Sequence, residues 1–111
     1  MDIDNLTIRE ARELTQIFSR QSANELPFVV RKPYFIRTIT HHYTGRLEKI
    51  IGKFLVLREA AWIADDGRFS NALGSGEFEE VEPYPDVQVF LNTETILDAI
   101  EFEHELPKVQ K

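Results

Sequence analysis

The side chains best suited to chemistry are cations and aromatic rings between positions 37 and 84. The candidate binding residues are Arg37, Arg46, Arg58, Trp62, Arg68, Phe69 and Tyr84. Arginine holds phosphate or carboxylate through a planar set of donors, and aromatic rings stack on planar ligands. These residue types predict a site for an anionic small molecule, such as a nucleotide-like ligand. Alternatively, the rings of the 64–86 segment pack as its own small core, and Trp62 lies in the core or an interface.

No combination of residues predicts catalysis. A hydrolase needs a nucleophile, a base and an oxyanion site within mutual reach. None of the serines lies in a Gly-x-Ser-x-Gly turn, and Gly74-Ser75-Gly76 is too short for a phosphate loop and has no lysine. The carboxylate pair Glu101 and Glu103 favours a solvated acidic edge. We therefore expect a protein that is not an enzyme.

Metal ligands are also scarce. The sequence has no cysteine, His41 and His42 are adjacent, and His104 is far from both. Neighbouring residues in a strand point to opposite faces, so the two histidines favour a polar turn over shared chelation. We expect neither a metal nor a cofactor.

Length and charge limit the function classes further. The chain has 111 residues, which suits a single domain over 1–111, and a net charge of −6. That balance argues against broad contact with nucleic acid. The charge is uneven: residues 31–58 are basic, and residues 77–105 contain no lysine or arginine. No apolar run reaches the roughly 20 residues of a membrane span, and no leader is recognisable, so we expect a cytoplasmic protein without membrane contact.

Periodicity predicts one helix followed by strands. Thr7 and Glu10 have the spacing of a capping box, and apolar residues recur at helical intervals behind them, which predicts a helix over 8–20. Aromatic and β-branched runs predict strands at 34–40, 43–51, 54–63, 87–91 and 96–102. Between the third and fourth, residues 64–86 contain turn signals and prolines, which predicts an irregular insertion with room for one helical turn at 68–73 and for either a loop or an edge strand at 78–85. The expected fold is mainly β (α+β): an N-terminal helix and a five-stranded small barrel formed by 34–63 and 87–102.

Two segments of the barrel region resemble a known family. Residues 44–60 contain a glycine early in one strand, a turn at 51–53, and Leu57-Arg58-Glu59-Ala60 in the next. This pattern, with a second apolar strand and turn at 89–96, resembles the Sm-like fold. The resemblance implies a small barrel and ring-like assembly. The RNA-binding Asp, Asn and Arg-Gly of that family have no counterparts here, which argues against RNA as a partner.

Other segments resemble an uncharacterised group of small phage and prophage proteins. They are residues 34–38, 60–65 with 67–69, 81–86, and 104–107 with 110–111. That resemblance implies a phage-related setting in a bacterial host cytoplasm and no particular activity. The leading hypothesis is a non-enzymatic binding module that forms a homo-oligomer through its edge strands. A binder of a nucleotide-like ligand at a subunit interface and a phage structural or assembly protein remain as alternatives.

Overall fold

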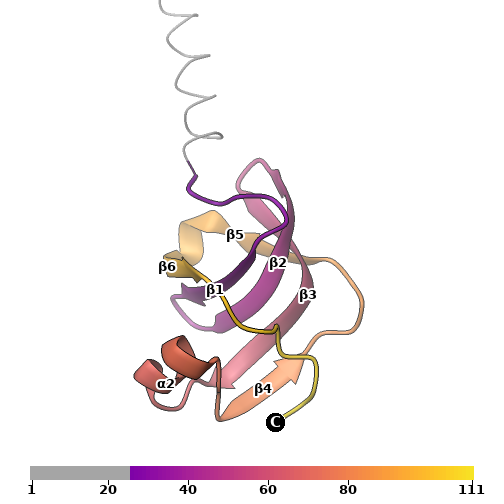
Figure 1. Cartoon of the computed structure of the whole chain (residues 1–111). Coiled ribbons are helices and arrows are strands. Elements are labelled where there is room, and N and C mark those ends of the chain that lie inside the picture. Colours follow the sequence, from indigo (N-terminus) through magenta and orange to yellow (C-terminus); the bar gives the residue numbers. More distant parts are fainter. Residues whose placement is uncertain (1–25) are drawn as a thin grey trace, which may run out of the picture.

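The computed structural model describes residues 26–111, and the helix predicted over 8–20 lies outside that part of the chain. The described part is mainly antiparallel sheet (Figure 1). Its strands are β1 (Pro33–Thr38), β2 (His42–Ile51), β3 (Phe54–Asp65), β4 (Glu80–Pro83), β5 (Val89–Asn92) and β6 (Ile96–Glu101). One α-helix, α2 (Phe69–Ser75), follows β3, and a 3-10 turn, η1 (Thr93–Thr95), joins β5 to β6.

Five of these strands lie where the residue pattern predicted strands, and the sixth corrects the prediction. β4 lies within 78–85, where the pattern left a loop or an edge strand open, and α2 overlaps the helical turn allowed at 68–73, so the insertion is less irregular than expected. The segment forms a strand because Val81 alternates with Glu80 and Glu82: the valine is buried and both glutamates are exposed. Pro83 ends this short strand, which pairs with β3 on one side.

The expected five-stranded barrel is wrong, because the six-stranded sheet is not closed. The strand order is β4-β3-β2-β1-β6, and β5 joins by pairing with β3. The two halves of the long β3 have different neighbours: residues 54–57 pair with β5 and residues 61–65 pair with β4. Within residues 26–111, β6 pairs with β1 alone, so no ladder joins the two ends of the sheet. The long strand β3 therefore has a different partner along each half, β5 and then β4, and the sheet stays open.

A bulge bends the sheet at the middle of β3. Thr44 pairs with Ala61 and Arg46 with Arg58, so Gly45 faces two residues, Glu59 and Ala60. Glu59, the first of these two residues, has a φ of 51°, in the left-handed region that the first residue of a G1 bulge adopts. At Gly45 a Cβ atom would lie 3.1 Å from Cδ1 of Leu57. Glycine at this position thus lets β2 approach the bent strand closely.

The sheet buries apolar side chains on both faces. A first core contains Tyr34, Ile36, Leu47, Leu55, Leu57, Ala60 and Leu91. A second core contains Phe35, Ala61, Ile63, Ala72, Phe78, Val81, Phe102 and Leu106. Successive residues of β1 contribute to opposite cores, because side chains alternate along a strand. Helix α2, the segment before β4 and residues 102–106 cover the second core.

The last ten residues run back across the sheet (Figure 1). The backbone N–H of Phe102 donates to the carbonyl oxygen of Pro33, and Phe102 and Leu106 are buried in the second core. Lys111 and Val81 exchange backbone hydrogen bonds of 2.9 and 3.0 Å, which extends the sheet beyond β4. Nε2 of His104 lies 2.9 Å from the carbonyl oxygen of Leu73, which links this tail to α2. The tail is therefore an integral cover of the fold.

Candidate functional site

The seven candidate residues do not gather at a single site. Arg37, on β1, is held by Asp98 of β6: its Nε donates to Oδ1 at 2.7 Å, and its Nη2 contacts Oδ2. The guanidinium carbon lies 4.7 Å from the centre of the Phe69 ring on α2. The structure brings Arg37 and Phe69 together, as a planar ligand site requires. The Asp98 carboxylate, however, already occupies the donors that a phosphate would use.

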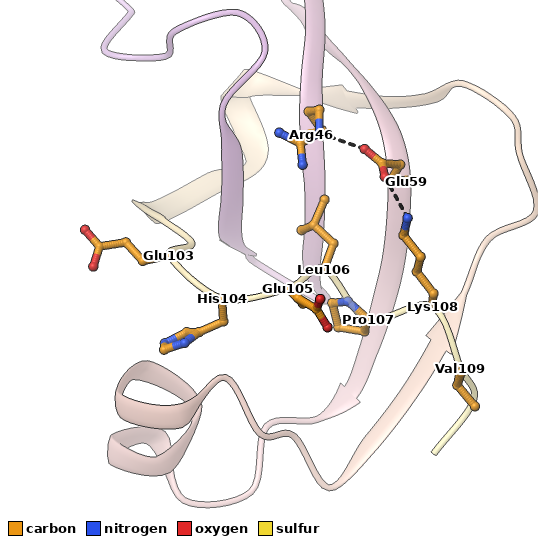
Figure 2. Close-up of a pocket in the computed structure, with 9 residues that line it drawn as sticks. All are labelled: Arg46, Glu59, Glu103, His104, Glu105, Leu106, Pro107, Lys108 and Val109. Atoms are coloured by element: carbon orange, nitrogen blue, oxygen red, sulfur yellow. Dashed lines mark hydrogen bonds and ion pairs between the residues drawn. The ribbon is translucent and has the colours of Figure 1, made fainter.

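Arg46 lies on one side of an open cavity of about 790 Å³ between the sheet and the tail. Figure 2 shows Arg46 and Lys108 both directed at Glu59. Nε of Arg46 is 2.7 Å from Oε2 of Glu59, and Nζ of Lys108 is 3.0 Å from Oε1. The two cations share one carboxylate and so fasten the tail to the bulge. Hydrogen bonds from both cations lower the pKa of Glu59.

Arg58 is also engaged with carboxylates. Its Nε donates to Oε2 of Glu48 at 3.2 Å, and its Nη1 lies 3.3 Å from Oδ1 of Asp86. The Gln88 amide donates to the same Glu48 oxygen at 3.1 Å. The Gln88 bond and then the Arg58 bond lower the pKa of Glu48. Arg58 therefore joins β2, β3 and the segment before β5. It is the cross-strand partner of Arg46, but the two guanidinium groups are held by different carboxylates, Glu48 for Arg58 and Glu59 for Arg46.

Arg68 stands apart from the other candidates, exposed at the N-terminus of α2, and forms no ion pair within residues 26–111. Together, the four arginines give no converging set of free cations in the described part of the chain. The geometry thus provides no shared anion site.

Trp62 and Tyr84 belong to a different arrangement, the aromatic strip, which consists of His41, Tyr43, Trp62 and Tyr84. Tyr43 and Trp62 are cross-strand partners on β2 and β3, so their side chains share a face. The His41 ring lies 5.6 Å from the Trp62 ring and 6.3 Å from the Tyr43 ring. Burial raises the pKa of Tyr43, and the neighbouring Tyr84 hydroxyl adds to this effect. Tyr43 and Trp62 are half-buried, whereas His41 and Tyr84 are exposed.

One end of the strip adjoins a cavity of about 490 Å³, the Trp62 cavity. Thr40, His41, His42, Trp62 and residues 63–67 line it. At its rim, Nδ1 of His42 lies 2.8 and 2.7 Å from the two oxygens of Asp66. Oδ1 of Asp65 accepts the Gly67 backbone N–H at 2.8 Å. The cavity thus combines an indole, two imidazoles and two carboxylates, and it contains no lysine or arginine.

Residue patterns missed most of this cavity. The adjacent histidines suggested a polar turn, and the structure indeed places His41 beside the β1–β2 turn. The pairing of His42 with Asp66 spans 24 positions, and no local pattern announces it. Tyr43 could have been recognised as a neighbour of Trp62, because it begins the predicted strand 43–51, which a tight turn joins to the predicted strand that contains Trp62.

Two observations concern the function classes considered above. Within residues 26–111, no group of three or more His, Cys, Asp or Glu side chains has an arrangement that could hold a metal ion. No helix in the same range is long and apolar enough to cross a membrane. Comparisons of the chain with protein-family models and with curated proteins give no match.

Proposed function

We propose that this chain is a non-enzymatic binding module that acts as a homo-oligomer. The proposal depends on one observation: within residues 26–111, β6 is an edge strand that carries exposed apolar side chains and no unpaired charge. Edge strands present unpaired backbone donors and acceptors, and most monomeric proteins protect them with charges, prolines or bulges. β6 has one such bulge, at Leu97, but no proline and no free charge, and an edge of this kind is suited to pairing with a second copy.

The charges on β6 are both engaged within the sheet. Asp98 is bound by Arg37, and Oε1 of Glu101 lies 3.0 Å from Nζ of Lys32. Leu97 is 68% exposed and Ile100 is 42% exposed, and the strand has no proline or lysine. What remains available on this edge is backbone and apolar surface, which supports strand pairing between copies.

The neighbouring strand β5 has the same character. Its four residues, Val89–Asn92, carry no charge, and Phe90 is 60% exposed. Within the described part of the chain, β5 pairs with β3 alone. The 3-10 turn Thr93–Thr95 places β5 directly before β6. A contact that uses both strands would bury Phe90, Leu97 and Ile100 together.

Light scattering coupled to size-exclusion chromatography tests the oligomer. The whole chain at micromolar concentration should elute as a multiple of the single-chain mass. Leu97→Lys combined with Phe90→Lys should shift the mass towards one chain, because both substitutions place a charge on the pairing edges. Val109→Lys is the matched control, since Val109 is 79% exposed but lies in the tail. A monomeric wild-type protein would exclude the proposal.

The phage-related setting, which depends on the resemblance alone, remains part of this proposal, as does the expected cytoplasmic location. The alternative of a nucleotide-like ligand gains no specific support, because Arg37, Arg46 and Arg58 are each paired with carboxylates. A thermal-shift screen with mononucleotides and cyclic nucleotides tests it: a concentration-dependent rise in melting temperature would favour that ligand.

A further inference from the structure

We infer that the Trp62 cavity and the aromatic strip bind a basic peptide segment of a partner protein, with an arginine or lysine side chain placed against the Trp62 ring. The inference concerns a surface separate from the β5 and β6 edges, and it holds for a monomer as well as for an oligomer. It reverses the expected ligand charge, from an anion held by arginines to a cation held by rings and carboxylates.

The ion pairs of the molecule establish the sign of the charge. The sheet arginines 37, 46 and 58 and the lysines 32, 53 and 108 all lie against carboxylates. By contrast, Asp65 and Glu82 form no ion pair within residues 26–111. Asp65 lines the Trp62 cavity, and Glu82 is the cross-strand partner of Trp62 on β4. Arg68, which follows the cavity residue Gly67, and Lys111, whose backbone pairs with Val81, also form no ion pair within this range. The Asp, Glu, Lys and Arg side chains that line the cavity or pair with Trp62 are nevertheless all carboxylates, namely Asp65, Asp66 and Glu82.

The rings supply the second part of the site. A cation over the face of an indole or phenol gains about 0.5–1 kcal/mol at an exposed position and more when water is excluded. Trp62 is the single tryptophan of the chain, and it is half-buried beside His41 and Tyr43. A guanidinium or ammonium group that enters the cavity can contact the ring and the Asp65 carboxylate together.

The extent of the strip favours a peptide over a single small cation. The strip crosses β2, β3 and the chain just after β4, where the N–H of Tyr84 donates to the carbonyl oxygen of Ala60 at 2.9 Å. Three neighbouring strands cover about 10 Å, since adjacent strands are about 4.8 Å apart. An extended peptide advances about 3.3 Å per residue, so three residues match the strip. One basic side chain would fill the cavity, and the next residues would lie along Tyr43 and Tyr84.

The intrinsic fluorescence of Trp62 provides a direct measurement. We would titrate the whole chain with the peptide acetyl-Gly-Arg-Gly-Arg-Gly-amide, and in parallel with the same peptide carrying citrulline at both arginines. Citrulline keeps the shape of arginine and removes the charge. The inference predicts a saturable change with the arginine peptide, weakening as salt is raised, and no saturable change with the citrulline peptide.

Substitutions test which side chains contact the peptide. Isothermal titration calorimetry measures the affinity of the Trp62 variant, which lacks the fluorescent side chain. Glu82→Gln and Asp65→Asn should each weaken the arginine peptide about twofold to fivefold, the range of an exposed ion pair. Trp62→Leu should weaken it more. Glu103→Gln removes the same charge from the cavity between the sheet and the tail, away from Trp62, and should leave the affinity unchanged.

Three results would overturn the inference. The first is the absence of saturable binding of the arginine peptide at millimolar concentration. The second is equal binding of the citrulline peptide, which would remove the role of charge. The third is spermidine binding as tightly as the peptide with the same dependence on Glu82 and Trp62, which would indicate a small-cation site in place of a peptide site.

Discussion

Arg37 and Asp98 are joined across β1 and β6 by two side-chain contacts, of which the Nε–Oδ1 hydrogen bond measures 2.7 Å. The Phe69 ring covers the guanidinium at 4.7 Å. One side chain thus connects the edge strand β6, the strand β1 and the helix α2. This connection keeps β6 in place while it removes the free charge that would otherwise protect that edge.

Acid should weaken this connection. The Arg37 hydrogen bonds lower the pKa of Asp98 in the folded protein, whereas the unfolded chain keeps the ordinary value of about 4. The stabilisation is therefore complete above about pH 5 and disappears as the pH falls through the lowered pKa. Asp98→Asn should reduce the free energy of unfolding at pH 7 by up to about 1 kcal/mol, because half of the Asp98 side chain is exposed.

Urea unfolding at pH 7, 5, 4 and 3 measures this effect. The difference between wild type and Asp98→Asn should shrink towards pH 3. Glu94→Gln serves as the control, because the Glu94–Lys53 pair is 62% and 69% exposed and should contribute less. A difference for Asp98→Asn that stays constant across this range would show that the carboxylate charge is not responsible.

A second prediction concerns two buried threonines, of which one has a hydrogen-bonded hydroxyl and the other does not. Thr44 is fully buried in the sheet, and its hydroxyl has no hydrogen-bond partner among residues 26–111. The hydroxyl of Thr38 donates to the carbonyl oxygen of His41 at 2.7 Å and accepts the His41 N–H at 3.0 Å. Thr44→Val should stabilise the protein by about 1 kcal/mol, whereas Thr38→Val should destabilise it by about 1–2 kcal/mol.

Thermal and urea unfolding of the two valine variants would measure this contrast. Each substitution exchanges a hydroxyl for a methyl group at a buried strand position, so size and β propensity change equally. If Thr44→Val were as destabilising as Thr38→Val, the Thr44 hydroxyl would have to be hydrogen-bonded after all.

A third prediction separates two glycines. At Gly45 an added Cβ would lie 3.1 and 3.2 Å from Leu57 atoms and 3.4 Å from Cβ of Ala60. At Gly74, within α2, it would meet nothing within 4 Å. Gly45→Ala should therefore destabilise the fold by about 1–3 kcal/mol, while Gly74→Ala should stabilise it by about 0.5–1 kcal/mol through helix propensity. Urea midpoints that move in the same direction for both variants would contradict the close approach at the bulge.

The positions of five strands could be predicted because their signals are local. Alternating and aromatic runs mark β1, β2, β3, β5 and β6, and Gly52 marks the turn between β2 and β3. β4 could not be told from a loop, because its four residues include one buried side chain and prolines stand at positions 83 and 85. Whether the sheet closes into a barrel could not be judged from the sequence, because it depends on which strands pair with each half of β3.

The candidate site was harder to predict for an electrostatic reason. The sequence shows where arginines stand, but it does not show which carboxylates they meet. Arg37 meets Asp98, which is 61 positions away, and that contact removes it as an anion ligand. Trp62 was among the candidate residues, but its neighbours His41 and Tyr43 could be recognised only from the pairing of β2 with β3.

A fourth prediction concerns the tail. Leu106 is 7% exposed in the second core, whereas Val109, three residues on, is 79% exposed. Leu106→Ala should lower the free energy of unfolding by about 2–5 kcal/mol, because it leaves a cavity beside Phe102 and Val81. Val109→Ala should change it by less than about 0.5 kcal/mol. Comparable urea midpoints for the two variants would show that the tail contributes little to the second core.

The two-sided burial of β1 has a consequence for how the chain finds its alignment. Tyr34 and Ile36 enter one core and Phe35 enters the other, so a slip by a single position would send every one of these side chains into the wrong compartment. In a strand with one solvent-exposed face, a slip changes buried packing on the other face only. In β1 such a slip would misplace buried side chains on both faces. The register of β1 therefore fixes how β2 and β6 align with it.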